Sequence, residues 1–596
     1  MYKKSVIALG LFVALGGCSL DGDDGQVGPA GETGATGQAG VDGQNGKNTS
    51  GLFNIQLVGR AVLNTESPEG AAEIVAYQTS KQWIYAINSS GDKPSVEIIP
   101  ADNFDSAALT KNSEGVVTTT NLSPAISIDL NAHTQGDANS LAISSDDMWL
   151  AVAMAGQTGE QGNIAFYDVS GEVPVFVKNV LVGYLPDMVT FTPDTNKVVV
   201  ANEGEPAGDY SIDPEGSISV IEMTATGPAD SATLISLTQF NSQQAELEQQ
   251  GVMFANPKGR TIKGKLINTT VAMDLEPEYI TISSDSKTAY VTVQENNALL
   301  IVNLETNSVK LQGLGFKDWS NLSFDASDKD GGVNFKQYPG LFGMYQPDTI
   351  TNFTWQGAEF LVTANEGDGR EYFFDAADEV SCLAAGGLDF DSDDGCLSYV
   401  DESRVKDLNL ADNFSYLNND NDDIGRLKVT TVKGDADQDG RYEALYTYGA
   451  RSFTIWDSNG LVVFDSGDQV DRITASIHGA AFNNDEDTNE GDTRSDAKGA
   501  EPEALAVGKV GERTLAFIGL ERMGGVLVYD VTNPYNTQFV DYFINRGLVE
   551  GADISGDLAP EGMKFIRAEH SATGEALLVI GNELSGSVAV WQIAQK

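Results

Sequence analysis

A strand–turn–strand pattern recurs along this chain, and no other feature of the sequence constrains the fold as strongly. Its clearest copy runs from Arg494 to Val531, where three apolar segments are separated by turns that contain glycine. Seven other segments resemble this copy and begin near the following residues: Glu73, Asn139, Pro186, Glu276, Pro347, Glu443 and Pro560. Several short strands per unit, repeated with insertions between the units, predict an all-β chain folded as a β-propeller.

The number of units predicts the number of blades. Eight units can be counted, and the one that begins at Glu443 is irregular, so we predict eight blades with seven as the alternative. The last unit ends at residues 592–596 and leaves no room for an outer strand. The isolated apolar segment Phe53–Val62 is therefore predicted to close the ring as that missing strand. A β-sandwich is the competing fold, but it would not require similar modules along the whole chain.

Long insertions separate some of the units. They follow Glu205 and occupy residues 231–267, 310–345 and 370–425. Loops carried by a rigid scaffold are where specificity usually lies, so these insertions are predicted to form loops on one face of the propeller. The segment 242–250, rich in Gln and Glu, is predicted to be helical.

The N-terminal segment has the composition of a targeting signal. Lys3 and Lys4 precede an apolar run too short to span a membrane, and this run ends in Leu-Gly-Gly-Cys18, which resembles a bacterial lipobox. We predict a lipoprotein signal peptide over residues 1–18 with Cys18 lipidated; an ordinary signal peptide is the alternative. Ser19 then favours the outer membrane of a Gram-negative bacterium, at the cell surface or in the periplasm. The membrane would be contacted only through the lipid.

Glycine stands at every third position from Gly22 to Gly46, which makes nine Gly-X-Y triplets. Only glycine fits the axis of a collagen triple helix, so residues 19–51 are predicted to be a collagen-like stalk. Pro29 is the one proline in this segment, so a flexible stalk and a stalk that forms a homotrimer both remain open. The β-propeller domain is predicted to occupy residues 52–596.

The charge balance excludes two classes of partner. The chain has 87 acidic and 36 basic residues, a net charge of −51, so nucleic acids and anionic membranes would repel it. This charge points to cations or to a cationic partner. Cys382 and Cys396 bracket a small acidic loop and are predicted to form a disulfide in an oxidising compartment.

Acidic residues recur at the start of the first strand and at the end of the second strand of the best units. The pairs are Asp187 and Glu203, Glu278 and Glu295, Asp348 and Glu366, Glu503 and Glu521, and Glu561 and Glu583, with Asp368 close behind Glu366. Antiparallel pairing places both acids of a pair on one face, and propeller symmetry brings all pairs around one axis. The sequence therefore predicts a funnel lined by carboxylates, which must be protonated, paired with Arg or bound to cations.

The chemistry of these side chains suggests which ion would bind. Oxygen-only ligands favour Ca²⁺, with another divalent metal as the alternative. His133, His478 and His570 are scattered, so a His-based metal site or catalytic triad is not expected. The competing interpretation is structural, because acids at turn starts often cap backbone N–H groups.

A second calcium signal lies outside the repeat. Asp435, Asp437, Asp439, Gly440 and Glu443 spell D-x-D-x-D-G-x-x-E, in which alternate carboxylates surround one ion and glycine permits the turn. The sequence predicts a Ca²⁺-binding loop here. A less regular candidate lies between the two cysteines, where a solvated acidic loop is the alternative: Asp389, Asp391, Asp393 and Asp394.

Four arginines stand near these acids: Arg370, Arg451, Arg494 and Arg522. Each could neutralise a neighbouring carboxylate, which is the commoner role. Arg370, Arg494 and Arg522 are the candidates for holding an anionic substrate oxygen, because a guanidinium can bind such oxygens in a bidentate manner.

Eight motifs, in order along residues 55–594, resemble the choice-of-anchor I family. They are VQENNALLIVNL (293–304), ANEGDGREY (364–372), RSFTIWD (451–457), FDSGD (464–468), AEPEALAVG (500–508), FIGLERMGGVLVYDVTNP (517–534), APEGMKFI (559–566) and GNELSGSVAVW (581–591). This resemblance implies a secreted or surface bacterial propeller attached by an anchor, here the lipobox and stalk. Relatives are often labelled alkaline-phosphatase-like, and animal relatives are mesenchyme-type surface glycoproteins.

Two functions follow from this resemblance together with the acids. The first is a calcium-dependent hydrolase of phosphoesters, acting on a small phosphorylated substrate. The second is a non-catalytic, calcium-stabilised module for binding or adhesion to a surface ligand. No Ser, Thr or Cys stands out as a nucleophile, and the family resemblance supplies no catalytic set to transfer.

Overall fold

The computed structural model describes residues 52–63, 68–91, 93–255 and 257–596. These residues belong to one unit, Thr49–Lys596. The predicted signal peptide, the lipidation of Cys18 and the collagen-like stalk lie outside the described residues.

Seven sheets in the described part of the chain share one plan of four antiparallel strands in up-and-down order. The first three sheets are β2 (Val75–Gln78), β3 (Trp83–Asn88), β4 (Ser95–Pro100) and β5 (Ile126–Asp129); β6 (Ala138–Ile143), β7 (Trp149–Met154), β8 (Gln161–Asp168) and β9 (Val175–Tyr184); and β10 (Pro186–Phe191), β11 (Lys197–Asn202), β12 (Ser217–Thr224) and β14 (Thr233–Ser236), with β13 (Gly227–Pro228) also paired to β12.

The other four sheets complete the set. They are β17 (Ile280–Ile282), β18 (Thr288–Val293), β19 (Ala298–Asn303) and β20 (Ser308–Gly313); β23 (Ile350–Trp355), β24 (Ala358–Asn365), β31 (Ser452–Asp457) and β32 (Val462–Asp465); β33 (Pro502–Val510), β34 (Arg513–Leu520), β35 (Val526–Asp530) and β36 (Gln538–Phe543); and β37 (Pro560–Ile566), β38 (Ala576–Asn582), β39 (Ser587–Gln595) and β1 (Phe53–Val62).

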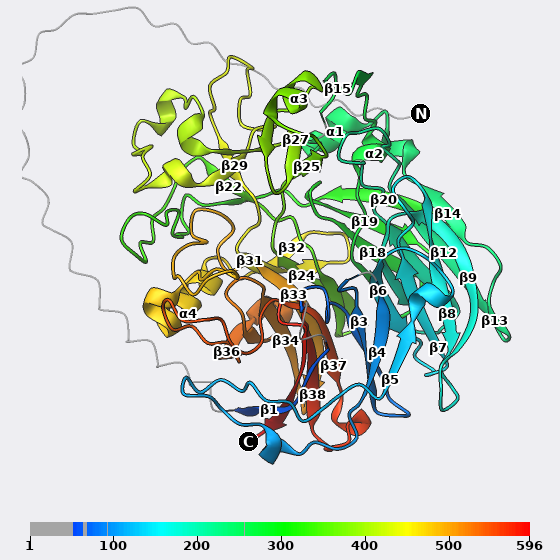
Figure 1. Ribbon diagram of the computed structural model, residues 1–596. Helices are drawn as coiled ribbons and strands as arrows, with labels where there is room; N and C mark the ends of the chain where they lie inside the picture. Colours follow the sequence, from blue (N-terminus) through cyan, green and yellow to red (C-terminus); the bar gives the residue numbers. More distant parts are fainter. Residues whose placement is uncertain (1–51, 64–67, 92, 256) are drawn as a thin grey trace, which may run out of the picture. The chain divides into compact units, whose positions relative to one another are not determined.

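These sheets form a closed ring. The first strand of each sheet packs against the first strand of the next, in the order β2, β6, β10, β17, β23, β33, β37 and back to β2. The prediction of a β-propeller is confirmed (Figure 1). The middle strands are buried along nearly their whole length, as in β11 and β38, because each sheet is covered on both faces by its neighbours.

The preference for eight blades was wrong for the described residues, and seven is the number that the ring contains. The unit that begins at Glu443 is not a separate blade, because β31 pairs with β24 and β32 with β31. Asn365 Nδ2 donates to Ser452 Oγ, 87 positions later, so the chain leaves this sheet after its second strand and returns for the third. β30 (Leu445–Thr447) pairs instead with β22 (Leu341–Met344) outside the ring.

The N-terminal strand closes the ring, as predicted. β1 pairs antiparallel with β39, from Phe53 opposite Gln595 to Val62 opposite Ser587. Figure 1 shows β1 beside the C-terminal sheet.

Helices and short strands build the insertions. The helices are α1 (Gln244–Gln249), α2 (Val271–Asp274), α3 (Glu379–Ala384) and α4 (Gln469–His478), and α1 confirms the helix expected near residues 242–250. The strands are β15 (Thr261–Ile262), β16 (Lys265–Leu266), β21 (Phe316–Asp318), β25 (Glu371–Phe374), β26 (Asp389–Asp391), β27 (Gly395–Val400), β28 (Glu402–Arg404) and β29 (Lys428–Thr430). Cys382 in α3 and Cys396 in β27 form the predicted disulfide, with Cα atoms 5.3 Å apart.

Candidate functional site

A carboxylate stands at or just before the start of the first strand in all seven sheets of the ring. These acids are Glu73, Asp137, Asp187, Glu278, Asp348, Glu503 and Glu561. Asp137 was missed from the sequence, because the second unit was aligned on Asn139, and a β-bulge between Ala138 and Ser140 displaces that strand's start. An acid directly before a buried strand is the signal that could have found it.

The local backbone explains why these acids face the axis. In four blades the residue two positions before the acid has a left-handed backbone and is followed by proline, at Leu185, Gln346, Glu501 and Ala559, with φ of 45°, 38°, 54° and 58°. In the blades of Asp187, Glu503 and Glu561 a β-bulge follows, and such bulges turn a side chain away from the regular alternation. Non-glycine residues in this conformation are strained, and such strain concentrates at functional sites.

A second set of acids stands at the end of the second strand, in three blades directly after a buried asparagine. Asn202, Asn365 and Asn582 tie the second strand to the third through their side-chain amides. Asn202 donates to Ser217 O, and Asn582 donates to Ser587 O. The glutamates that follow are thereby held at the same end of each sheet: Glu203, Glu366 and Glu583.

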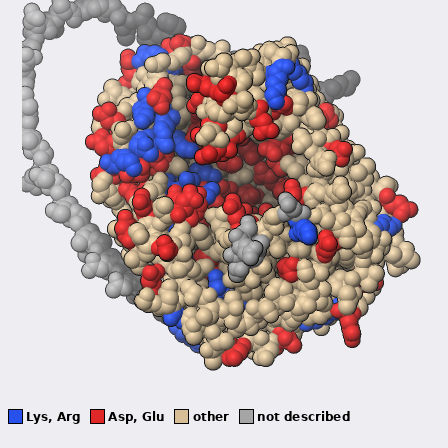
Figure 2. All heavy atoms as spheres, viewed as in Figure 1, with Lys and Arg blue, Asp and Glu red and all other residues tan. Residues whose placement is uncertain are grey.

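The two sets of acids converge on the axis. Burial, followed by repulsion from Glu366, raises the pKa of Asp348 to about 8, and burial, followed by repulsion from Glu583, raises the pKa of Glu73 to about 8. Asp187 of the third blade is also among the acids that act on Glu73 of the first blade, so the interactions reach across the ring. Figure 2 shows a hollow lined by Asp and Glu, with Lys and Arg along one side. We call this hollow the acidic mouth.

Turn capping does not account for these acids. Among the first-strand acids in the described part, none has a backbone N–H donor to its carboxylate, and among the second-strand acids and Asp368 only Asp368 has one, from Gly369. Buried carboxylate oxygens of Glu278, Glu295, Glu503 and Glu521 have no hydrogen-bond partner. Such oxygens are costly to bury unless a cation or a proton satisfies them.

Four groups of three acids among the described residues bring their carboxylate oxygens within 4.8 Å of one another. Two of them, Asp325 with Asp330 and Asp492, and Asp485 with Glu486 and Asp487, lie in the insertions; the other two are built from the acids of the repeated units. The axial triad consists of Asp348, Glu503 and Glu561, from three consecutive blades. The lysine-bound triad consists of Glu366, Glu501 and Glu521. Burial raises the pKa of Glu503 and of Glu561 well above the usual value. Repulsion from Glu521 and Glu561 adds to the shift of Glu503, and repulsion from Asp348 adds to that of Glu561, whereas a hydrogen bond with Glu503 lowers the pKa of Glu561.

The lysine-bound triad is neutralised by three cations. Lys498 Nζ lies 2.6 Å from Glu366 Oε1 and 3.1 Å from Glu501 Oε2. Arg494 Nη2 lies 2.6 Å from Glu501 Oε1, and Arg522 Nε lies 3.2 Å from Glu501 Oε2. Although burial opposes it, the charge of Lys498, Arg494 and Arg522 lowers the pKa of Glu501 to about 2.

The three arginines predicted to hold an anionic substrate oxygen, Arg370, Arg494 and Arg522, line a single cavity of about 180 Å³, the arginine cavity. Lys428, Lys498 and Tyr448 line it as well, and so does Asp368 at the edge of the acidic mouth. Arg370 is buried in ion pairs, with Nη1 3.1 Å from Asp274 Oδ1 and Nη2 2.8 Å from Glu276 Oε2. Arg451 is also buried, and its Nη2 donates to Ser495 O and Ala497 O. Each arginine thus forms an ion pair with a carboxylate or donates a hydrogen bond to a backbone carbonyl.

The predicted calcium loop brings its four carboxylates together. Oxygens of Asp435, Asp437, Asp439 and Glu443 lie within 4.8 Å of one another. Asp435 Oδ2 accepts a hydrogen bond from the backbone N–H of Gly440, and Glu443 Oε2 accepts one from the backbone N–H of Ala436. Gly440 has a φ of 85°. The acids between the cysteines lie differently: Asp389 and Asp391 are exposed on β26, and Asp391 Oδ1 accepts from Asp393 N.

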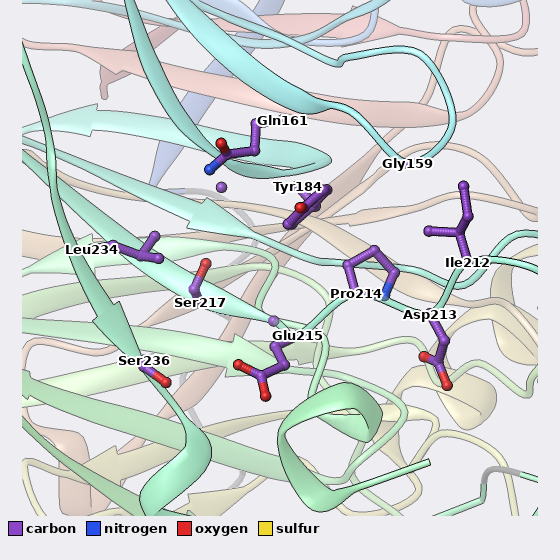
Figure 3. Close-up of a pocket in the computed structure, with 12 residues that line it drawn as sticks. Gly159, Gln161, Tyr184, Ile212, Asp213, Pro214, Glu215, Ser217, Leu234 and Ser236 are labelled. Carbon is purple, nitrogen blue, oxygen red and sulfur yellow. The ribbon is translucent and has the colours of Figure 1, made fainter. Parts of the chain in front are cut away.

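Two further cavities adjoin each other beside the second and third sheets and the insertion that follows Glu205. One, of about 390 Å³, is lined by Gln161, Tyr184, Asp213, Glu215 and Ser217 among others (Figure 3). The other, of about 440 Å³, shares Tyr184 with it and extends to Glu205 and Glu371. Glu371 lines both this cavity and the arginine cavity. No Lys or Arg lines the first two.

Fold and mouth together define the class of protein: a β-propeller domain with an acidic axial mouth. A family model for the choice-of-anchor I domain matches residues 73–534, and the chain belongs to that family. In the part of the chain that the structure covers, no helix has the length and apolar character needed to cross a bilayer.

Two curated relatives match part of the chain. Gigasin-3a of Magallana gigas is 29% identical over 186 residues, which are 28% of this chain and 64% of that protein. Mesenchyme-specific cell surface glycoprotein of Strongylocentrotus purpuratus is 26% identical over 255 residues, which are 40% of this chain and 32% of that protein. The chain therefore spans less than two thirds of the length of either relative.

Solved structures resemble the chain at low identity. Hydrazine synthase of Kuenenia stuttgartiensis matches 89% of this chain and 97% of its own, at 11% identity and a TM-score of 0.42. The periplasmic gluconolactonase PpgL of Pseudomonas aeruginosa matches 91% and 96%, at 13% identity and a TM-score of 0.35. No activity is transferred from either.

Proposed function

We propose that this chain is a surface-anchored, calcium-dependent phosphoester hydrolase whose reaction centre lies at the junction of the axial triad and the arginine cavity. One observation carries the proposal: a cluster of uncompensated carboxylates adjoins a cavity lined by Lys and Arg. Lys498 joins the two, because it lines the cavity and forms an ion pair with Glu366. The charge of Glu366 in turn repels that of Asp348. Such a junction offers a cation and a set of N–H donors to one phosphoryl group.

The residues fit a hard divalent cation. The axial triad offers only carboxylate oxygens, the ligand type that Ca²⁺ and Mg²⁺ prefer. Glu503 Oε2 is buried without a hydrogen-bond partner, so the site has an acceptor that a cation would satisfy. A bound ion would neutralise phosphoryl oxygens and lower the pKa of a water molecule.

The protein side chains position the substrate. Arg494 binds Glu501 through Nε and Nη2, and about a fifth of its side-chain surface is exposed to the cavity. A guanidinium held in this way has little freedom left to lose, and it can donate a further hydrogen bond to a phosphoryl oxygen. Lys498 holds Glu366 and Glu501 in place, so the acids and the donors keep a fixed relation.

Hydrolysis of p-nitrophenyl phosphate and of bis-p-nitrophenyl phosphate tests the proposal. We expect activity with Ca²⁺, loss of activity with EDTA and recovery when Ca²⁺ is restored. Glu503→Gln should lower kcat/KM by at least about 100-fold, since an ion ligand is lost, whereas Asp137→Asn should change it little. A correctly folded, metal-loaded chain that cleaves neither substrate with any divalent cation would contradict the proposal.

The second candidate is a calcium-stabilised module that binds a glycan at the cell surface, and the cavity of about 390 Å³ favours it. Tyr184 and Pro214 offer flat apolar faces, and Gln161, Ser217 and Ser236 offer hydrogen-bonding groups to the same space (Figure 3). Sugar rings are recognised by this combination of an aromatic face and convergent polar groups. Calorimetric titration with neutral oligosaccharides tests this candidate. Binding that Tyr184→Ala abolishes, in a chain without hydrolase activity, would favour it.

The calcium loop and the anchor complete the proposal. Asp435, Asp437, Asp439 and Glu443 would bind a structural Ca²⁺. Residues 1–51 would place the chain on the outer membrane through lipidated Cys18 and the stalk. Cys18→Ser should release the protein from membranes, and sedimentation of the intact chain distinguishes a homotrimer from a monomer. One relative, the mesenchyme-specific cell surface glycoprotein, carries a name that agrees with a place on the cell surface.

A further inference from the structure

The acids nearest to the axis differ in how their charge is compensated. Among the described residues, no Lys, Arg or His forms an ion pair with Asp348, Glu503 or Glu561. All three members of the lysine-bound triad have such a partner: Glu366 and Glu501 pair with Lys498, and Glu521 lies 3.1 Å from Arg522 Nη2. Two groups of similar composition thus stand side by side in opposite electrostatic conditions.

The axial triad also has a buried acceptor that nothing satisfies. Glu503 is 9% exposed, and its Oε2 has no hydrogen-bond partner although its carboxylate lies within 4.8 Å of those of Asp348 and Glu561. Three carboxylates at this separation repel one another strongly in a buried site. An oxygen-binding cation at their centre would remove the repulsion and supply the missing partner.

The lysine-bound triad has no need of an added ion. Lys498 Nζ sits between Glu366 and Glu501, where it bridges two carboxylates as a metal ion would, and it also lies 3.7 Å from Asp368 Oδ1. The Lys498 side chain is only 14% exposed.

We propose that the mouth binds one divalent cation, on Asp348, Glu503 and Glu561, and that the ammonium of Lys498 takes the place of a second cation on Glu366 and Glu501. The inference rests on the proposed function only for what the ion does there. Phosphoester hydrolases with two ions hold them about 3.5–4 Å apart across the reacting group. Here one of the two positive charges is covalently attached to the chain and cannot be removed by a chelator.

Counting bound Ca²⁺ tests the inference without any substrate. The experiment uses the full chain carrying Asp437→Asn and Asp439→Asn, which removes ligands from the calcium loop. Asp330→Asn and Asp487→Asn in the same chain remove one ligand from each of the two acidic groups outside the mouth. We expect one Ca²⁺ per chain by equilibrium dialysis and elemental analysis. Glu503→Gln in this background should raise the Kd at least about 100-fold, as the loss of a direct ligand, whereas Asp137→Asn, which removes the same charge from the mouth, should change it less than about twofold.

Substitution of the lysine supplies the decisive comparison. Lys498→Met should raise the count from one Ca²⁺ to two, whereas Lys498→Arg, which keeps the positive charge, should leave it at one. If Lys498→Met does not fold, as judged by circular dichroism, Lys498→Gln replaces it with the same expected count of two. No bound ion in the background chain, an unchanged Kd in Glu503→Gln, or a folded neutral variant that still binds one ion would each overturn the inference.

The outcomes separate this inference from the proposed function. A chain that binds one ion but cleaves no phosphoester contradicts the hydrolase and leaves the single-ion site standing. A chain that cleaves phosphoesters with two ions bound in the mouth contradicts only the role proposed for Lys498 and leaves the hydrolase proposal standing.

Discussion

Arg60 Nε, in the strand that closes the ring, lies 2.6 Å from Asp557 Oδ1, in the segment that leads into the last blade. The two residues are 497 positions apart, and their side chains are 5% and 6% exposed. Asp557 also accepts from Ser587 Oγ and Asn545 Nδ2, at 2.7 and 2.8 Å. One buried carboxylate therefore joins β1 to β39 and to the segments on either side of the link between the last two blades.

Removing this arginine should weaken ring closure. Arg60→Met leaves Asp557 buried without its cation, so we expect the free energy of unfolding to fall by about 3–5 kcal/mol. Denaturant unfolding followed by tryptophan fluorescence measures the change. The double variant Arg60→Met/Asp557→Leu is the control, and it should recover part of the loss because no charge is left unpaired. Equal losses in the single and double variants would contradict a role for the ion pair.

Stability of the metal-free protein should depend on the protonation of Glu73. Burial, followed by repulsion from Glu583 and Asp187, raises the pKa of Glu73 from 4.5 to about 8, so between these values the folded state holds a proton that the unfolded state releases. Folding is then favoured at low pH, and this contribution is lost as the pH rises through 8. Glu73→Gln should raise the free energy of unfolding at pH 9 by roughly 2–5 kcal/mol.

Thermal unfolding in EDTA at pH 5 and pH 9 checks the prediction for Glu73. The gap between wild type and Glu73→Gln should be small at pH 5 and large at pH 9. Asp391→Asn removes the same charge from the exposed strand β26 and controls for net charge. A gap that does not grow with pH would show that the carboxyl group is not the cause.

The calcium loop should stabilise its own insertion. Ca²⁺ at 100 times the Kd of this loop adds about 2.7 kcal/mol to the stability of the folded state. Asp437→Asn should abolish that increment for the segment around residues 428–450, measured by hydrogen exchange with and without Ca²⁺. Asp391→Asn, in the exposed hairpin, is the matched control and should leave the increment intact. Protection that Ca²⁺ does not change in the wild-type loop would contradict the prediction.

The disulfide should stabilise a local structure and leave the axis unaffected. Cys382 and Cys396 are 14 positions apart, and closing a loop of about this length contributes about 3 kcal/mol. Replacing both by alanine should accelerate proteolysis within residues 375–400, while the Ca²⁺ affinity of the axial triad stays the same. Loss of axial binding in this variant would show that the insertion also supports the mouth.

Much of the fold was predictable because local sequence patterns determine it. Buried strands recur in each blade, X-Pro-acid starts in five blades and Asn-Glu ends in three. The closing strand was identifiable because an apolar segment lacked a partner. The blade count was not predictable in the same way. Asn365 and Ser452 meet across an insertion, and no local pattern shows that the second half of a sheet follows so far along the chain.

The mouth was predictable in composition but not in charge compensation. The repeated acids identified the glutamates that reach the axis. Lys498 has no counterpart in other blades, so its position between Glu366 and Glu501 became evident only once the turn before β33 was folded. The arginines gather for the same reason: their loops meet through tertiary contacts that sequence spacing does not reveal.

Closure by the first strand also determines how the ring responds to a pull. β1 begins beside the end of β39, at Phe53 opposite Gln595, and β39 joins the rest of its sheet from the opposite end, at Ser587. Tension that enters at residue 52 therefore loads the two strands in shear, so that the rungs between them share the force instead of opening one by one. In a propeller tethered through this end, all the hydrogen bonds between β1 and β39 would resist the pull of a flowing medium together before any blade unfolds.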